Sequence, residues 1–102
     1  MSAARIAVAS GTLVTVKAWV KRSNSSNIGA RLRIPARMLG GIGTSDLTAA
    51  HSAGSNTYQE LTLTFTPTES GVVEVFFDAY TLLTSGTPSD SAWIDDMTIT
   101  QA

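Results

Sequence analysis

Four aspartates, Asp78, Asp90, Asp95 and Asp96, are the side chains in this sequence with the widest scope for chemistry. Two carboxylates held at a set separation on either side of a cleft can hydrolyse a glycosidic bond. Asp78 and Asp95 stand in consecutive extended segments, so they could approach each other, although the sequence does not define their spacing. Any of these carboxylates could instead accept hydrogen bonds from the backbone of a neighbouring loop and hold that loop in place.

Asp95 belongs to an alternating stretch in which every second side chain points to the same face of a strand. It shares one face with Trp93, Met97 and Ile99, so this face is predicted to belong to the core with a carboxylate set into it. A buried carboxylate is costly unless it is hydrogen-bonded, paired or bound to a metal. Asp95 is therefore a candidate structural tether or calcium ligand, with the tether preferred to calcium and calcium to catalysis. No other cofactor is expected.

His51 is the only histidine, which rules out a metal site built from several histidines. A Ser-His-Asp triad would need a nucleophile elbow, and no such motif is present. The glycines of residues 40–43 lack the Lys-Ser/Thr ending and the strand–loop–helix setting of a phosphate-binding loop. We expect His51 to be a solvated or hydrogen-bonded strand residue, the glycines to form a connection between strands, and the protein not to be an enzyme.

Three aromatic side chains, Trp19, Phe76 and Tyr80, fall on strand faces that are predicted to be polar. Exposed aromatic rings on a sheet form a platform for a sugar ring or for a partner protein. Arg31 and Arg33 alternate with inward residues, so both could bind carboxylate or sulfate groups from one outer face. These five residues are the candidate ligand-binding set. In the alternative, Trp19 lies in the core, because a strand that is covered on both sides buries both of its faces.

Extended segments separated by turns must position these side chains. Apolar and polar residues alternate with a period of two in seven segments, and no segment keeps a helical period. The segments are residues 5–9, 13–21, 30–35, 47–51, 58–66, 72–80 and 91–99. Turn formers such as Gly, Asn, Ser and Pro lie between them, at a spacing typical of sandwiches. The sequence therefore predicts an all-β fold, an antiparallel β-sandwich of about seven or eight strands.

The length of 102 residues fits one small domain, residues 1–102. The formal net charge is −1 and 15% of the residues are charged, which argues against a nucleic-acid partner because such proteins usually carry a basic stripe. No apolar run approaches the roughly 18 residues that a membrane-spanning helix needs, so no membrane partner is expected. Cysteine is absent, and the first residues lack the apolar core of a signal peptide.

Four sequence blocks follow one another along the chain: residues 14–21 (VTVKAWVK), 58–67 (YQELTLTFTP), 71–75 (GVVEV) and 93–97 (WIDDM). In order and spacing they resemble the jelly-roll superfamily of carbohydrate-binding modules, and also jelly-roll domains of phage capsid-decorating, head-fibre and tail-associated proteins. The resemblance implies a jelly-roll sandwich, a structural calcium near Asp95 and aromatic residues on a concave sheet. Members of the superfamily carry one or two further strands before the position of Leu13, and these usually contribute to the calcium site. A sandwich short of a strand exposes an edge that a neighbouring molecule could cover by strand addition.

These observations lead us to expect a non-catalytic structural protein of a virion, which stabilises a phage-like assembly through protein–protein contacts. The expected partners are capsid or tail subunits and further copies of the chain in a homo-oligomer. The expected contacts are sheet edges and apolar loop residues, namely Met38, Leu39, Ile42, Leu82 and Leu83. The alternative is a carbohydrate-binding module that recognises a glycan through exposed aromatics, and that is secreted as part of a larger protein.

Overall fold

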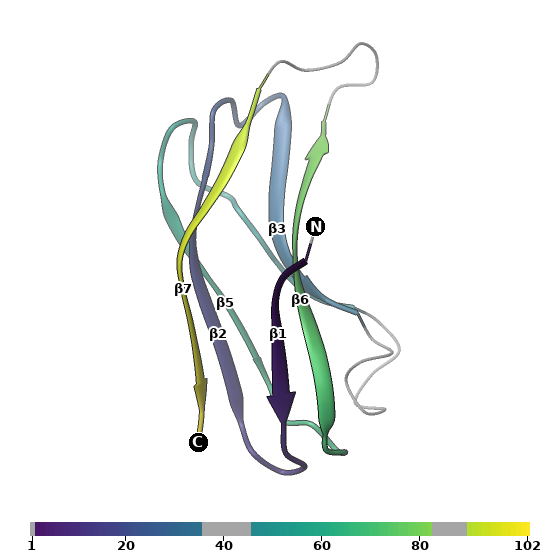
Figure 1. Cartoon of the computed structure of the whole chain (residues 1–102). Helices are drawn as coiled ribbons and strands as arrows, with labels where there is room; N and C mark the ends of the chain where they lie inside the picture. The colour runs from purple at the N-terminus through teal and green to yellow at the C-terminus, as the bar shows by residue number, and fades with distance from the viewer. Residues whose placement is uncertain (1, 36–45, 83–89) are drawn as a thin grey trace.

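All seven predicted extended segments are β-strands in the computed structural model, which describes residues 2–35, 46–82 and 90–102 (Figure 1). The strands are β1 (Ser2–Val8), β2 (Val14–Arg22), β3 (Ile28–Ile34), β4 (Leu47–Ala50), β5 (Gln59–Phe65), β6 (Gly71–Thr81) and β7 (Ala92–Gln101). Each overlaps its predicted segment, with ends that differ by a few residues. Within the described ranges, no helix has the length and hydropathy to cross a membrane.

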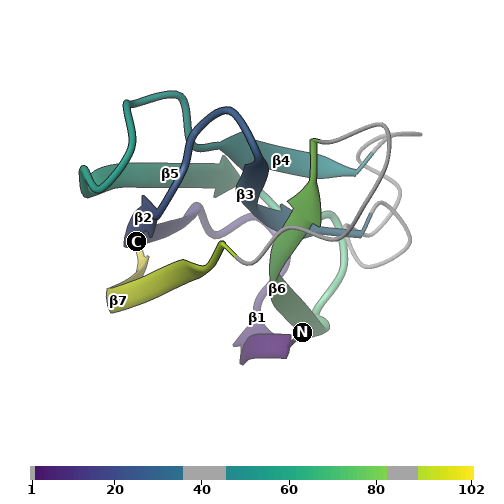
Figure 2. The same ribbon diagram turned by 90° about the horizontal axis from the view of Figure 1, so that it is seen from above.

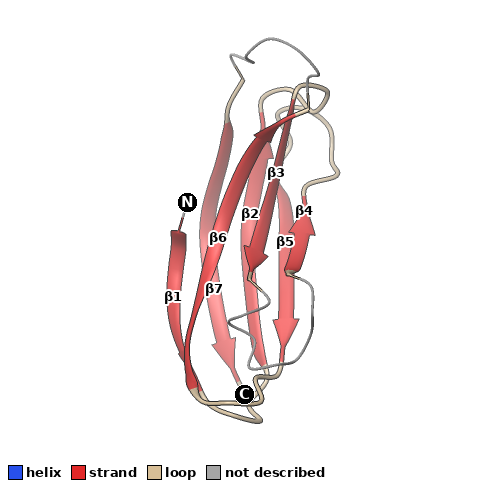
Figure 3. Ribbon diagram, turned by 90° about the vertical axis from the view of Figure 1, so that its right-hand side faces the viewer, coloured by secondary structure: helices blue, strands red, loops and turns tan. Residues whose placement is uncertain are grey.

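The strands form two antiparallel sheets that pack face to face. The larger sheet has the order β1-β6-β3-β4 and the smaller has the order β5-β2-β7. Figure 3 shows the four-stranded sheet in front of the three-stranded one, and Figure 2 shows the two layers from above. The predicted all-β class is confirmed, and the arrangement fits a β-sandwich.

The core lies between the two sheets and is built from the alternation that the sequence displays. In β2, the four inward apolar side chains Val14, Val16, Ala18 and Val20 are all fully buried. The inward side chains of the other strands complete the same cluster: Ile6, Val8, Ala30, Leu32, Ile34, Leu61, Leu63, Phe65, Val73, Val75 and Phe77. Burial of this apolar surface is the main favourable term in folding. The chain has no disulfide to add to it.

The predicted alternation is wrong in β7, where a β-bulge shifts the pairing with β2. Trp19 lies opposite Asp95, but Lys17 lies opposite Thr98, so β7 contains one extra residue between these pairs. Asp96 supplies it, with φ at 51°, in the left-handed region. The bulge reverses which side chains face the core: Asp95 is exposed, whereas Ile94 packs against the core. The prediction of a carboxylate set into the core at Asp95 is therefore wrong.

The two sides of the molecule are closed differently. On one side, the edge strands β4 and β5 contact each other. On the other side lie β1 and β7, the edge strands of the two sheets, as Figure 2 shows. A hydrogen bond from Nε2 of Gln101 to the carbonyl of Ala7, 3.0 Å, connects these strands near the end of β7. Between them, the partly buried side chains of Ile94 and Met97 line a groove together with Ser2 and Ala3 of β1.

Candidate functional site

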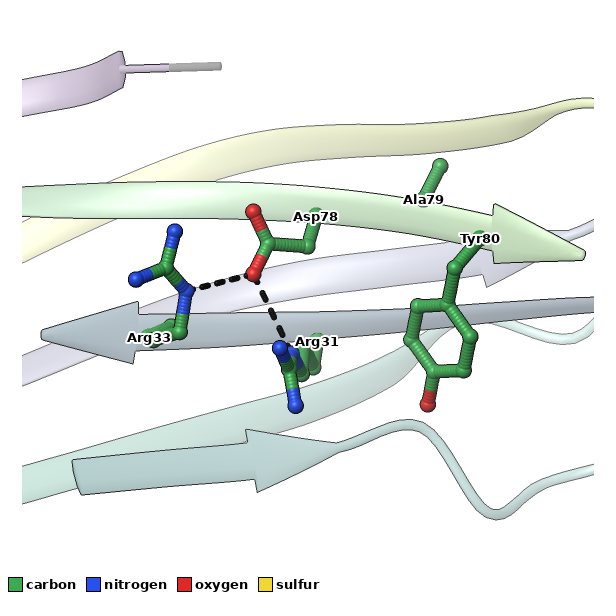
Figure 4. Close-up of a pocket in the computed structure, with 5 residues that line it drawn as sticks. All are labelled: Arg31, Arg33, Asp78, Ala79 and Tyr80. Atoms are coloured by element: carbon green, nitrogen blue, oxygen red, sulfur yellow. Dashed lines mark hydrogen bonds and ion pairs between the residues drawn. The ribbon is translucent and has the colours of Figure 1, made fainter. Parts of the chain in front are cut away.

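Arg31, Arg33 and Asp78 meet on the outer face of the four-stranded sheet, as Figure 4 shows. The register of β3 and β6 places Arg31 opposite Asp78 and Arg33 opposite Phe76. Oδ2 of Asp78 accepts a hydrogen bond from Nε of each arginine, at 3.1 Å from Arg31 and 2.7 Å from Arg33. Nη1 of Arg33 also lies 3.5 Å from the carboxylate of Asp46. Two cations thus share one carboxylate.

This carboxylate is partly shielded from water, with 19% of the Asp78 side chain exposed. The hydrogen bond from Arg33 has the largest effect on the pKa of Asp78 and lowers it. Partial burial opposes this effect, and the hydrogen bond from Arg31 adds to it. The same Asp78 hydrogen bond raises the pKa of Arg33. Both shifts favour the charged forms of Asp78 and Arg33.

Aromatic rings flank the two arginines. The guanidinium carbon of Arg31 lies 5.5 Å from the centre of the Tyr80 ring, and that of Arg33 lies 4.8 Å from the centre of the Phe76 ring. Both distances lie within the range of cation–π contacts. Two aromatic rings therefore flank three charged groups in one surface of β3 and β6, which we call the arginine row: Phe76, Arg33, Asp78, Arg31 and Tyr80.

Gly29 gives the Tyr80 ring its position at the end of the arginine row. The two residues are opposite each other in β3 and β6. A Cβ atom on Gly29 would overlap the far end of the Tyr80 ring, so the ring rests directly on the glycine backbone. The absence of a side chain at this position therefore allows Tyr80 to lie beside Arg31.

The arginine row contains an open pocket of about 480 Å³, lined by Arg31, Arg33, Asp78, Ala79 and Tyr80 (Figure 4). The Nε atoms of both arginines donate hydrogen bonds to Asp78, whereas the terminal nitrogens of Arg31 have no hydrogen-bond partner among the described residues. Free guanidinium nitrogens beside an aromatic ring can bind an anionic group and stack a ring at the same time. The chemistry of this pocket suits a ring-shaped ligand that carries a carboxylate or sulfate.

Trp19, the fifth member of the predicted set, lies on the other side of the molecule. It faces outward from the three-stranded sheet, opposite Glu60 in β5 and Asp95 in β7. Its side chain is 41% exposed, so the alternative that placed it in the core is wrong. The structure brings four of the five predicted residues together and separates Trp19 from them.

Trp19 has aromatic neighbours that the sequence analysis missed. It lines a pocket of about 260 Å³ with Tyr58 and the carboxylates Asp95 and Asp96. Nearby, Nζ of Lys21 lies 5.0 Å from the centre of the Tyr58 ring and 4.6 Å from that of Trp93. Lys21 is opposite Trp93 in the sheet register. Uninterrupted alternation assigned Trp93 to the core, and only the bulge at Asp96 turns it outward.

The carboxylate that tethers a loop is Asp90 rather than Asp95. Oδ1 of Asp90 accepts a hydrogen bond from Oγ of Ser23, and Oδ2 accepts one from Nδ2 of Asn27, both 3.0 Å. Asp90 thereby fastens the loop after β2 to the chain that enters β7. Oδ1 of Asp95 instead accepts a hydrogen bond from the adjacent backbone N–H of Asp96 at 2.9 Å.

The calcium ion that the resemblance implies near Asp95 stays a prediction. Calcium takes six to eight oxygen ligands, usually several carboxylates with backbone carbonyls. In the described part of the chain, no three acidic, histidine or cysteine side chains gather in a metal-holding group. Asp95 also lies on the outer face of the three-stranded sheet and Asp78 on the outer face of the four-stranded sheet. The expectation that these two could flank one cleft as glycosidase carboxylates is therefore wrong.

His51 is buried and hydrogen-bonded just after β4. Its Nδ1 accepts a hydrogen bond from Nε of Arg22, 2.7 Å, so its Nε2–H donates to the carbonyl of Thr57 at 2.9 Å. Both ring nitrogens are thus occupied by groups that do not belong to a catalytic triad. Arg22 is buried as well, although the sequence analysis did not single it out. Arg22 continues the period-two series of inward residues after Val20, and this position could have indicated its burial.

The predicted apolar contact residues can be placed only in part. Met38, Leu39, Ile42 and Leu83 lie outside the described residues, as do the glycines at positions 40, 41 and 43. Leu82 is described and is 45% exposed, and its N–H donates to the carbonyl of Asn27.

Comparisons with protein-family models, curated proteins and solved structures found no match.

Proposed function

We propose that this chain is a non-catalytic virion component with jelly-roll connectivity, which decorates a capsid or belongs to a tail of a phage-like particle. It stabilises the assembly by burying its exposed sheet edge against neighbouring subunits. A partner that binds only the assembled state stabilises that state by mass action. The sequence resemblance to phage structural proteins motivates the setting, and the open side of the two sheets supports the mechanism.

The supporting observation is the hydrophobic side between β1 and β7. Ile99 lies opposite the fully buried Val16, on the core side of the sheet, and is nevertheless 37% exposed. Ile94 and Met97 pack only partly against the core. These two side chains help to line a groove of about 350 Å³ with Ser2, Ala3, Asp95 and Asp96. A core that reaches the surface along a strand edge is typical of a site that another chain covers.

Purified particles from cells that express this gene test the proposal. We expect mass spectrometry to find the chain in the particles at a stoichiometry related to that of a capsid or tail subunit. Particles that lack the chain should lose their contents at a lower temperature than complete particles. Absence of the chain from the particles, or equal stability with and without it, would overturn the proposal.

A second candidate function is recognition of an acidic glycan by the arginine row. It is favoured by the terminal nitrogens of Arg31 beside Tyr80, which have no hydrogen-bond partner in the described part of the chain. A glycan array that includes uronate and sulfated sugars tests it. Tyr80→Ala should abolish binding, and Gly29→Ala should weaken it by displacing the ring. Trp19→Ala, on the opposite face, is the matched control and should leave binding unchanged. Loss of binding in the control alone, or no binding to any acidic glycan, would contradict this function.

A further inference from the structure

The last part of β7 presents unpaired backbone groups at the edge of the three-stranded sheet. In the described ranges, β7 pairs with β2 alone. The N–H of Ala102 donates to the carbonyl of Leu13 at 3.0 Å. Backbone groups alternate in direction along an antiparallel ladder, so those of Thr100 and Thr98 also point toward β2. The N–H and C=O groups of Met97, Ile99 and Gln101 therefore point away from the sheet.

This edge has little protection against pairing with another strand. Natural edge strands are usually short, bulged, charged or covered. Here β1 carries Arg5 and an irregular register between Ser2 and Ala4, and β4 has only 4 residues and contacts β5. In β7, by contrast, the five residues after the bulge, 97–101, include neither charge nor proline.

The exposed segment is also complementary to itself. Thr98-Ile99-Thr100 reads the same in both directions, so an antiparallel copy centred on Ile99 would place each threonine opposite a threonine. Ile99 would lie opposite Ile99, on the same face as the buried Val16, so the two exposed isoleucine side chains would bury each other. Thr–Thr and β-branched cross-strand pairs stabilise antiparallel sheets.

We propose that two copies of this chain pair through their β7 edges about a two-fold axis at Ile99, which joins their three-stranded sheets into one continuous sheet. In each copy, Ile99 exchanges hydrogen bonds with Ile99 of the other, and Met97 exchanges them with Gln101. Asp95 and Asp96 lie beyond the paired segment, so the acidic side chains of the two copies do not oppose each other. This interface deepens the proposed function, since it names the partner of the same exposed edge.

Solution mass measured over a range of concentrations tests the pairing with the full chain. We expect a monomer–dimer equilibrium that Ile99→Lys weakens at least about tenfold, or about 1.4 kcal/mol. Circular dichroism of the variant shows whether its monomer keeps the fold. A monomer at every concentration, or a dimer that Ile99→Lys leaves unchanged, would overturn the pairing.

Disulfide trapping tests the register, because the native chain contains no cysteine. Ile99→Cys places two thiols on opposed residues of a hydrogen-bonded pair, about 5.5 Å apart between Cα atoms, which a disulfide can span. Thr98→Cys is the matched control, since residue 98 lies opposite residue 100. Mild oxidation should cross-link the Ile99→Cys protein and not the Thr98→Cys protein. Equal cross-linking of both would contradict the register.

The two proposals can fail separately. A monomeric chain that is present in particles, and that detaches from them when Ile99→Lys is introduced, would show that a different protein covers β7. That result would overturn the self-pairing and keep the assembly role. A chain that dimerises through Ile99 but is absent from particles would overturn the assembly role and keep the self-pairing.

Discussion

Single residues determine the chemistry of the arginine row. An exposed ion pair usually contributes little to stability, because water screens it and both side chains lose freedom. Asp78 differs because it is partly buried and accepts hydrogen bonds from two guanidinium groups at once. Removing this one carboxylate would leave two positively charged groups, Arg31 and Arg33, side by side with no anion between them. We therefore expect Asp78 to contribute more to the free energy of unfolding than an ordinary surface carboxylate does.

Asp78→Asn should lower the free energy of unfolding by about 1–2 kcal/mol at neutral pH, allowing for the remaining exposure of the arginines. The pKa of Asp78 is lower in the folded state, chiefly through the Arg33 hydrogen bond. Its contribution is therefore complete above the unfolded pKa of about 3.9 and is lost as pH falls through the folded value. Urea unfolding at neutral and acidic pH measures this, and the variant should lose less stability in acid than the native chain.

The two arginines also differ in a way that NMR titration of Asp78 can detect. Arg33→Met should raise the pKa of Asp78 further toward its ordinary value than Arg31→Met does, because the Arg33 hydrogen bond has the largest effect. The opposite order would contradict the geometry in which Arg33 makes the shorter bond.

Much of the arginine row could be predicted from the sequence, and the reason is simple. Period-two alternation places Arg31 with Arg33, and Phe76 with Tyr80, on outward faces. Alternation does not say which strands are neighbours, and the pairing of β3 with β6 brings the two sets together. Trp19 obeys the same alternation, yet its strand belongs to the other sheet. An alternating pattern therefore predicts which side chains share one face of a strand, but not to which sheet that strand belongs.

At the scale of elements, one residue in β7 changes the role of its neighbours. The bulge at Asp96 turns Asp95 and Trp93 to the solvent and Ile94 to the core. An alternating sequence pattern contains no signal for an inserted residue, except that aspartate tolerates the left-handed backbone better than most residues. The prediction of a buried carboxylate at Asp95 depended on uninterrupted alternation and is wrong for that reason.

Asp96→Val should destabilise the fold by about 1–2 kcal/mol, because a β-branched residue is strained at the left-handed φ of 51°. Asp96→Gly should be neutral or stabilising, since glycine adopts this conformation freely. Asp95→Val is the neighbouring control, at an exposed position of the ladder, and should cost much less. Chemical denaturation compares the three variants, and equal losses at 95 and 96 would argue against the bulge.

Loops at one end of the molecule are joined by a buried cation. Besides its bond to His51, Arg22 donates to the carbonyls of Ser25, Ile28 and Ala53. These carbonyls belong to the chain after β2 and to the turn after β4. The guanidinium group therefore supplies the hydrogen bonds that these carbonyls cannot make with water.

Arg22→Met should lower the free energy of unfolding by about 2–3 kcal/mol, because it leaves buried acceptors without donors. Amides near Ile28 and Ala53 should exchange with solvent faster than in the native chain. Arg31→Met is the surface control and should cost about 1 kcal/mol or less. If the amides near Ile28 and Ala53 exchanged only through global unfolding in both variants, this role of Arg22 would be contradicted.

At the scale of the whole molecule, the two sheets share one hydrophobic core, so neither is expected to be stable alone. Leu32 in the larger sheet and Val16 in the smaller one are both fully buried in that core. Cooperative unfolding of both layers together follows from this shared burial.

Two optical probes can test that cooperativity. Trp19 and Trp93 both lie in the three-stranded sheet, so tryptophan fluorescence follows that sheet, whereas far-UV circular dichroism follows both. The two unfolding curves should coincide. Leu32→Ala, in the other sheet, should shift both equally, by about 2–5 kcal/mol. A fluorescence transition that Leu32→Ala leaves in place would show that the sheets unfold independently.

The amino-acid sequence by itself determined the all-β class, the positions of the strands and most of the core, because burial on one face of a strand leaves a period of two that can be read residue by residue. Only the tertiary structure decided which strands are neighbours, and with it the union of Arg31, Arg33, Phe76 and Tyr80, the separation of Trp19, and the outward turn of Asp95. These outcomes depend on pairing and on one inserted residue, which are long-range properties of the folded chain. The edge of β7 joins both levels, since its palindrome can be read from the sequence and its exposure only from the structure.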